Sequence, residues 1–151
     1  MSSRAEGIVA RARALVGVRF RAQGRCAAGG VDCIGLAAAA LELDGVRQDY
    51  ALRGGCGARL AEELRLAGLA PVSAAEAGDL LVMQAGPGQL HLGIWTGAGL
   101  IHADAGLKRV VERPGSPPWP VAEVWRVESN PSTIAGADGP PSHAAGPHWE
   151  D

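Results

Sequence analysis

The apolar residues of this chain change their spacing near residue 78, and this change restricts the fold more than any other feature. Before it, three segments are typical of helices: residues 3–16, 33–43 and 58–67. After it come five short segments, rich in β-branched or aromatic residues and separated by Gly, Pro or Asp: residues 78–83, 90–95, 99–103, 109–112 and 121–127. Helices followed by strands predict an α+β fold, with N-terminal helices packed on a five-stranded, mainly antiparallel sheet.

Capping residues mark the ends of the first two helices. Ser3 followed by Glu6 is a capping-box pattern, and Gly17 is expected to end that helix. Asp32 is expected to cap the second helix, which Asp44-Gly45 then stops. Because the second helix is apolar on almost every side, we expect it to be buried.

Length and composition indicate one domain followed by a tail. A chain of 151 residues that is 47% hydrophobic can bury one sizeable core. Residues 1–128 contain every predicted element. Residues 129–151 are rich in Pro, Gly and Ser, so we expect a disordered tail. His143 and His148 fall in this tail, where the sequence offers no partners for a metal site, and they are expected to be solvated.

Charge and cysteine content argue against several classes of protein. The net charge of −2 gives no reason to expect a nucleic-acid partner or an anionic membrane surface. Cys26, Cys33 and Cys56 cannot all pair and lack zinc-site spacing, so we expect neither a disulfide framework nor a metal. Arginines interrupt the first 20 residues, and no later run reaches the roughly 20 apolar residues of a membrane span. We therefore expect synthesis in the cytoplasm without a signal peptide.

Cys33 begins the second helix, in the stretch GGVDCIGLAAAA (residues 29–40). One interpretation is structural, because a free cysteine packs well in a core. The other is chemical: the partial positive charge at a helix N-terminus lowers the pKa of the thiol, and the unpaired N–H groups there stabilise an oxyanion. A nucleophilic thiol also needs a general base.

His91 is the candidate base. In the segment LHLGIW (residues 90–95), Leu92 and Ile94 form the apolar face that must turn to the core, so His91 faces the other side. Taken alone, His91 is better explained as a half-buried sheet residue with a satisfied hydrogen bond.

His102 joins His91 if the two strands pair in one particular register. If Gly97-Ala98 forms a two-residue hairpin loop, Gly93 lies opposite His102, and the two histidines are diagonal neighbours with the space between them left open by Gly93. A loop of odd length would put them on opposite faces. The set then predicts Cys33 as nucleophile, His91 as base and His102 as the group that orients it.

These residues resemble the active-site pattern of the NlpC/p60 family of papain-like cysteine peptidases, which cut the peptide stems of the bacterial cell wall. The segments VDCIGL, GDLLVM, HLGIW and IHADAG carry the resemblance, which covers about residues 5–127. It implies the NlpC/p60 fold and hydrolysis of peptidoglycan stem peptides, at the bond between γ-D-glutamate and a diamino acid. It implies no metal and no organic cofactor.

Within that family the chain is most similar to peptidases encoded among the tail genes of phages and gene transfer agents. The loop FRAQGRCAAGGVDC, the segment HLGI and the closing VVE…PPWPVAEVWRV carry this similarity. It implies carriage in a phage-like particle, tail or baseplate proteins as partners, and action in the periplasm or cell wall without membrane insertion.

Phe20, Asp32 and Gly93 complete the expected site, in oxyanion or substrate roles. Phe20 occupies the position where family members usually have a tyrosine whose hydroxyl helps at the active site, so either backbone N–H groups stabilise the oxyanion alone or catalysis is weakened. Asp32 is either only a helix cap or also a contact for substrate. Gly35 is expected to allow close packing beside the cleft.

Two alternative functions stay open. The first is a structural tail component that binds wall peptide with hydrolysis weak or lost; Phe20 favours it, and the intact Cys33, His91 and His102 argue against it. The second is a cysteine-dependent amidase or acyltransferase on another substrate, because the same chemistry serves any acyl transfer. A wide apolar cleft would favour the second alternative.

Overall fold

The structure is a computed structural model that describes residues 2–43 and 57–128. The expected tail of residues 129–151, the Asp44-Gly45 turn and Cys56 lie outside the described residues. The described helices are α1 (Ser3–Ala14), α2 (Cys33–Leu41) and α3 (Gly57–Leu66). The described strands are β1 (Arg25–Cys26), β2 (Gly30–Val31), β3 (Leu69–Val72), β4 (Leu80–Gly86), β5 (Gln89–Trp95), β6 (Gly99–Asp104), β7 (Arg109–Pro114) and β8 (Val121–Val127). In these two ranges, no helix has both the length and the apolar character needed to cross a membrane.

Six strands form one antiparallel sheet in the order β3-β8-β4-β5-β6-β7, and β1 and β2 form a separate ribbon. The α+β class is therefore confirmed, and all five predicted strands are present. The prediction missed the edge strand β3, whose sequence LAPV contains Pro71. Proline donates no backbone hydrogen bond and is tolerated at sheet edges, so it weakens the sequence signal of a strand that nevertheless forms.

The N-cap of α1 is Ser2, not Ser3 as predicted. The Ser2 backbone is extended, and its hydroxyl accepts a hydrogen bond from the Ala5 N–H at 3.0 Å. Ser3 is already helical and so cannot take the conformation that an N-cap requires. The helix ends at Ala14, two residues before the predicted end at residue 16.

The cap of α2 is Asp32, as predicted, and its carboxylate accepts from the Gly35 N–H at 2.8 Å. The helix ends at Leu41 rather than near Leu43, because Glu42 takes a left-handed conformation (φ 56°) that cannot continue it. Most of α2 is buried, as its apolar sequence indicates.

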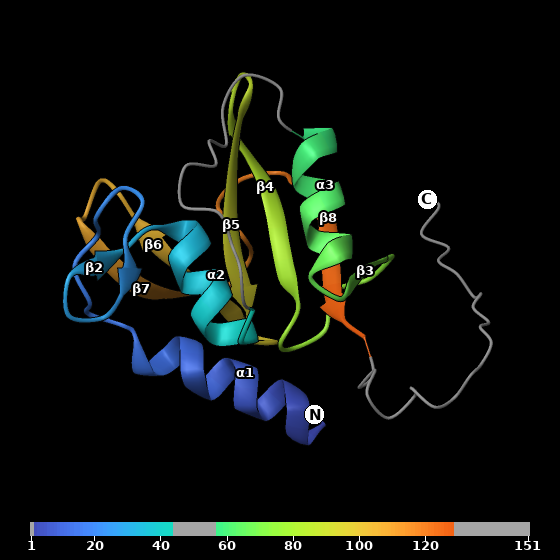
Figure 1. Ribbon diagram of the computed structural model, residues 1–151, viewed down its shortest axis with the longest axis horizontal. Helices are drawn as coiled ribbons and strands as arrows, with labels where there is room; N and C mark the ends of the chain where they lie inside the picture. Colours follow the sequence, from blue (N-terminus) through green and yellow to red (C-terminus); the bar gives the residue numbers. More distant parts are fainter. Residues whose placement is uncertain (1, 44–56, 129–151) are drawn as a thin grey trace.

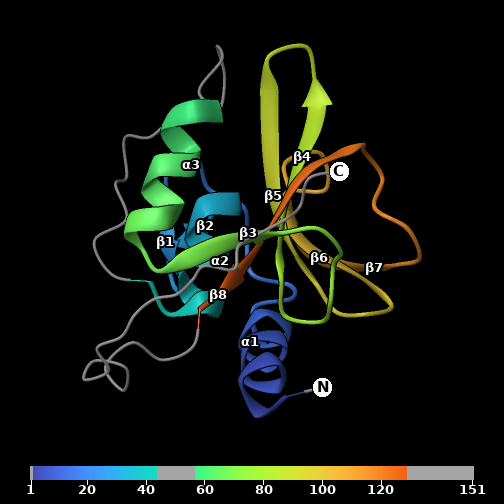
Figure 2. The same cartoon turned by 90° about the vertical axis from the view of Figure 1, so that its right-hand side faces the viewer.

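The two faces of the sheet are covered differently. Figures 1 and 2 show α2 and α3 on one side of the β4–β5 hairpin, and α1 packs against α2. The main core lies between these helices and the sheet, with Leu36 of α2, Leu60 of α3 and Ile94 of β5 among its buried residues. On the opposite face lies a smaller group, called here the outer cluster: Leu81, Met83 and Leu100, packed with Trp95, Trp119 and Val124.

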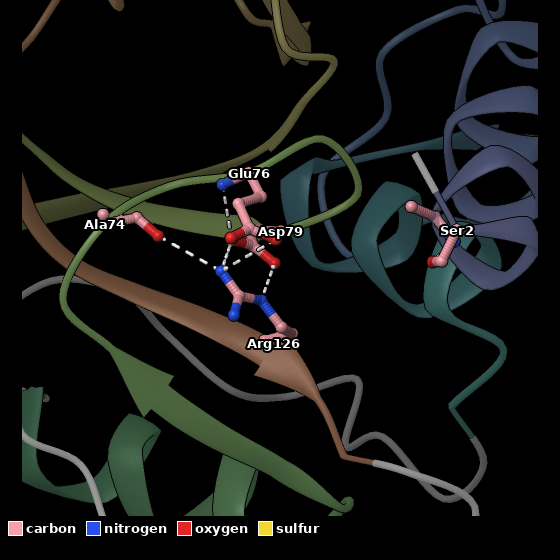
Figure 3. Close-up of polar contacts among 6 residues, drawn as sticks. Ser2, Ala74, Glu76, Asp79 and Arg126 are labelled. Carbon is pink, nitrogen blue, oxygen red and sulfur yellow. Dashed lines mark hydrogen bonds and ion pairs between the residues drawn. The ribbon is translucent and has the colours of Figure 1, made fainter.

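An ion pair between a buried carboxylate and a partly exposed guanidinium ties the chain before β4 to β8 (Figure 3). Asp79 is 1% exposed, and Arg126 donates to both of its carboxylate oxygens at 2.9 Å. The backbone N–H of Glu76 donates to the same carboxylate at 2.8 Å, and Arg126 also reaches the carbonyl oxygen of Ala74 at 3.1 Å. A buried carboxylate is costly unless it is paired in this way. The pair therefore helps to hold β4, and through it β5, in place.

Candidate active site

Cys33 is the first residue of α2 and is a buried, free thiol. The preceding Asp32 holds this turn against the glycine-rich loop. One of its oxygens accepts from Gly35 N–H and pairs with Arg25 Nη1 at 2.9 Å, and the other accepts from Gln23 N–H at 2.8 Å. The capping role of Asp32 is thus observed, and a role in substrate recognition stays a prediction.

The β5–β6 hairpin has the predicted register. The Thr96 N–H donates to the Gly99 carbonyl at 2.9 Å, so Gly97-Ala98 is a two-residue loop. Gly97 has a φ of 97°, a conformation that suits glycine. The recorded cross-strand partners are Trp95 with Leu100 and Ile94 with Ile101.

His91 and His102 meet side by side, as this register requires. The Nε2 atom of His91 lies 3.0 Å from Nδ1 of His102, and the two rings are perpendicular with centroids 5.1 Å apart. His102 is 1% exposed, and His91 is partly buried. His91 therefore uses Nε2 toward His102 and keeps Nδ1 for another partner.

The Cys33 thiol reaches β5 at the residue next to His91. The cross-strand pairs between β5 and β6 are Trp95 with Leu100 and Ile94 with Ile101, and they end before His91 is reached. The backbone of Leu92 instead makes a hydrogen bond with the Cys33 sulfur. The helix α2 packs on β5, and the joining of the thiol and His91 in one site stays a prediction.

Burial controls the charge state of the thiol. It raises the pKa of Cys33 to about 12, because a thiolate would lose its hydration; backbone hydrogen bonds from Leu92 and from Cys33 itself act in the opposite direction, and so does the charge of Arg25. The Asp32 carboxylate adds to the rise. The N–H at the helix start does lower this pKa, but desolvation outweighs it, so the net shift is upward.

The same cause keeps His91 neutral. Burial and, to a smaller extent, the charge of His102 lower the pKa of His91 to about 4. The carboxylates of Asp104 and Asp32 act in the opposite direction. Burial also lowers the pKa of His102. At neutral pH both shifts favour the uncharged forms, a thiol at Cys33 and a neutral imidazole at His91, over a thiolate and an imidazolium.

We expect Cys33 to react with iodoacetamide at pH 8 about 10²- to 10³-fold more slowly than a free cysteine. A thiol is reactive only when deprotonated, so a raised pKa leaves little thiolate at this pH, and the rate should keep rising beyond pH 10. The measurement uses a variant with Cys26→Ser and Cys56→Ser, in which Cys33 is the only cysteine. A rate that levels off below pH 8 would contradict the neutral pair.

Phe20 packs against the main core, and its N–H donates to the Lys108 carbonyl at 2.9 Å. Its backbone also forms an isolated bridge with Val31, two residues before Cys33. This position explains how Phe20 supports the loop that leads to the nucleophile turn. Its effect on an oxyanion stays a prediction.

Gly93 does not leave open space between the histidines as expected. A Cβ at this position would lie 2.6 Å from Cδ1 of Leu100 and 3.2 Å from the Ile101 carbonyl oxygen. The space beside Gly93 is filled by the neighbouring strand, so this glycine allows β6 to pack closely there. Its role toward substrate stays a prediction.

Trp119 is a residue of the site that the sequence prediction did not single out. It lies between β7 and β8, and its ring contacts those of both His91 and His102. The available signal was the segment PPWP, in which a large aromatic residue stands among prolines in a connection. Nothing local to that segment shows that it packs on residues 91 and 102.

Comparisons with known proteins support the fold. No family model matches the chain, and no curated protein does. Among solved structures, the NlpC/p60 domain of the peptidoglycan hydrolase SagA is similar, with 27% identity over 73% of this chain and 88% of that one and a TM-score of 0.51. The P60 domain of an antigen from Mycobacterium avium subspecies paratuberculosis has 19% identity over 85% and 97% of the two chains, with a TM-score of 0.56.

NlpC1 from Trichomonas vaginalis is a third similar structure, with 18% identity and a TM-score of 0.54. The match covers 81% of this chain, which spans only 44% of that protein. The architecture shared with these structures shows that the chain has the α+β NlpC/p60 fold.

Proposed function

We propose that this protein is a cysteine peptidase that hydrolyses peptide bonds in the stem peptides of peptidoglycan. The observation that carries the proposal is the contact of 3.0 Å between His91 Nε2 and His102 Nδ1. The residue after His91, Leu92, makes a backbone hydrogen bond with the Cys33 sulfur. These contacts support an arrangement in which Cys33 is the nucleophile, His91 the base and His102 the orienting group. The likeness to the NlpC/p60 domain of a peptidoglycan hydrolase supports the choice of substrate.

In the proposed reaction, the Cys33 sulfur attacks the peptide carbonyl while His91 Nδ1 takes the thiol proton. The thiol and imidazole begin neutral, so this proton moves as the carbon–sulfur bond forms. His91 then gives the proton to the leaving amine, and a thioester remains on Cys33. Water, deprotonated by His91, hydrolyses the thioester and restores the free thiol.

Backbone N–H groups at the start of α2 stabilise the negative oxygen of the tetrahedral intermediates. Asp32 already engages the Gly35 N–H, and its carbonyl accepts from Leu36. The N–H groups of Cys33 and Ile34 come first in the helix, where no carbonyl of its own is available to them. They therefore form the proposed oxyanion site, which needs no side-chain hydroxyl at Phe20.

The finer details rest on the resemblance in sequence. The bond cleaved is proposed to join γ-D-glutamate to a diamino acid. The protein is proposed to travel in a phage-like particle, with tail or baseplate proteins as partners, and to act in the periplasm or cell wall.

The test is digestion of purified peptidoglycan, with the products identified by mass spectrometry. Cys33→Ala is the control, and a new amino terminus on the diamino acid is the expected product. Equal products from the wild type and Cys33→Ala would refute the peptidase proposal. Sedimentation with peptidoglycan but no new products would instead favour the structural tail component.

A further inference from the structure

Trp119 packs against both histidines of the candidate active site. Its ring centroid lies 5.0 Å from that of His91 and 5.5 Å from that of His102, with interplanar angles of 75° and 89°. The two imidazoles also meet at 5.1 Å, so each of the three rings contacts the other two. Trp119 belongs to the outer cluster as well, which anchors it from the side of the sheet.

His102 needs a second constraint on its ring. Its Nδ1 atom faces His91, but its buried Nε2 atom has no hydrogen-bond partner within residues 2–43 and 57–128. One hydrogen bond does not prevent an imidazole from tilting or flipping. The orientation of His102 therefore depends on packing, and Trp119 contacts its ring in addition to His91.

The connection that carries Trp119 is held at both ends. The Gly115 N–H donates to the Ala98 carbonyl at 2.9 Å, beside the β5–β6 turn. The Pro120 carbonyl accepts from the Gln84 N–H of β4, also at 2.9 Å. The prolines around Trp119 restrict the backbone between these points, which limits the positions that the indole can reach.

We propose that Trp119 is a positioning residue, which orients His102 and excludes water from its hydrogen bond with His91. With the ring held in this way, His102 Nδ1 accepts from a proton on His91 Nε2, and His91 Nδ1 is left free to take the Cys33 proton. In the reverse tautomer, Nδ1 of His91 already holds a proton and cannot act as the base. The proposal rests on the proposed function in treating His91 as that base.

Three charged groups influence the pair in addition to the rings. The carboxylates of Asp104 on β6 and Asp32 before α2 raise the pKa of His91. Asp104 also raises the pKa of His102, and Arg113 on β7 lowers it. Removing the indole changes none of these charges. Its effect is therefore expected through water access and ring order.

The test is nitrogen NMR of the histidine rings in the wild type, Trp119→Ala and Trp119→Phe. We expect one tautomer of His91, protonated on Nε2, in the wild type and in Trp119→Phe. In Trp119→Ala we expect a mixture of tautomers, and a shift of the His91 pKa from about 4 toward the ordinary value of about 6.5. On peptidoglycan fragments, kcat should fall about 10- to 100-fold in Trp119→Ala with KM little changed.

Trp95→Ala is the matched control, because Trp95 is the other indole of the outer cluster. It should lower the melting temperature and leave the histidine tautomers unchanged. An unaltered tautomer and pKa in Trp119→Ala would overturn the proposal, and so would an equal change in Trp95→Ala. If Trp119→Ala does not fold, Trp119→Leu is measured in its place and judged by the same criteria.

The NMR result separates this proposal from the proposed function. If the wild type cleaves no peptidoglycan while Trp119→Ala releases the rings, the peptidase proposal fails and the positioning role stands. If the wild type cleaves peptidoglycan and Trp119→Ala keeps the wild-type tautomer and kcat, the positioning role is wrong.

Discussion

Replacing Cys33 with alanine is expected to lower kcat/KM for peptidoglycan cleavage by about 10⁴-fold or more, and replacing His91 with glutamine by about 10²- to 10⁴-fold. Alanine removes the only group proposed to attack the carbonyl. Glutamine keeps a polar side chain at position 91, but it cannot take the thiol proton. Steady-state kinetics on a soluble stem-peptide fragment measures both losses.

The double variant distinguishes a catalytic pair from two independent residues. Because the base acts only through the nucleophile, Cys33→Ala with His91→Gln should be no slower than Cys33→Ala alone. Cys56→Ser is the control, since the proposal gives that cysteine no role. Losses that multiply in the double variant, or full activity in either single variant, would show that the two residues do not act together.

Replacing Gly35 with alanine is expected to destabilise the protein by about 3 kcal/mol, at the upper end of the usual cost of overpacking. A Cβ at this position would lie 2.2 Å from the carbonyl oxygen of Gly24. That oxygen belongs to the backbone of the glycine-rich loop, which Asp32 holds against the start of α2. The loop and the helix cannot both keep their places, so activity should fall with stability. Urea unfolding followed by circular dichroism gives the free energy of unfolding.

Gly7→Ala is the matched control for this substitution, because it places the same methyl group inside α1. The Cβ there would lie 3.1 Å from Nη1 of Arg11, the end of a flexible side chain that can move aside. Alanine is also the better helix former, so Gly7→Ala should stabilise the protein by about 0.5–1 kcal/mol. If Gly35→Ala is as stable as the wild type, the close approach of α2 to the loop is not what positions Cys33.

The order of elements was predictable because its signals are local. The apolar segments and turn residues place α1, α2, α3 and the five strands within a few residues of their observed bounds. The errors lie at ends and edges. The N-cap at Ser2 and the end of α2 depend on the conformation of single residues, and β3 is stabilised by pairing with β8 rather than by its own sequence.

The meeting of His91 and His102 was also predictable, because strand register follows from loop length. A two-residue loop at Gly97-Ala98 is enough to bring both side chains to one face. The charge state of Cys33 was not predictable in this way. A helix start favours a thiolate, but burial raises the pKa of the thiol. The burial depends on packing against β5, which is distant from Cys33 in the sequence.

The sequence by itself determined the α+β order, the cap at Asp32 and the shared face of the two histidines, because each depends on backbone conformation among near neighbours. Only the tertiary structure decided that burial raises the pKa of Cys33 and that Trp119 contacts both histidines. Desolvation and ring contacts depend on which distant segments pack together, and local sequence patterns do not specify this.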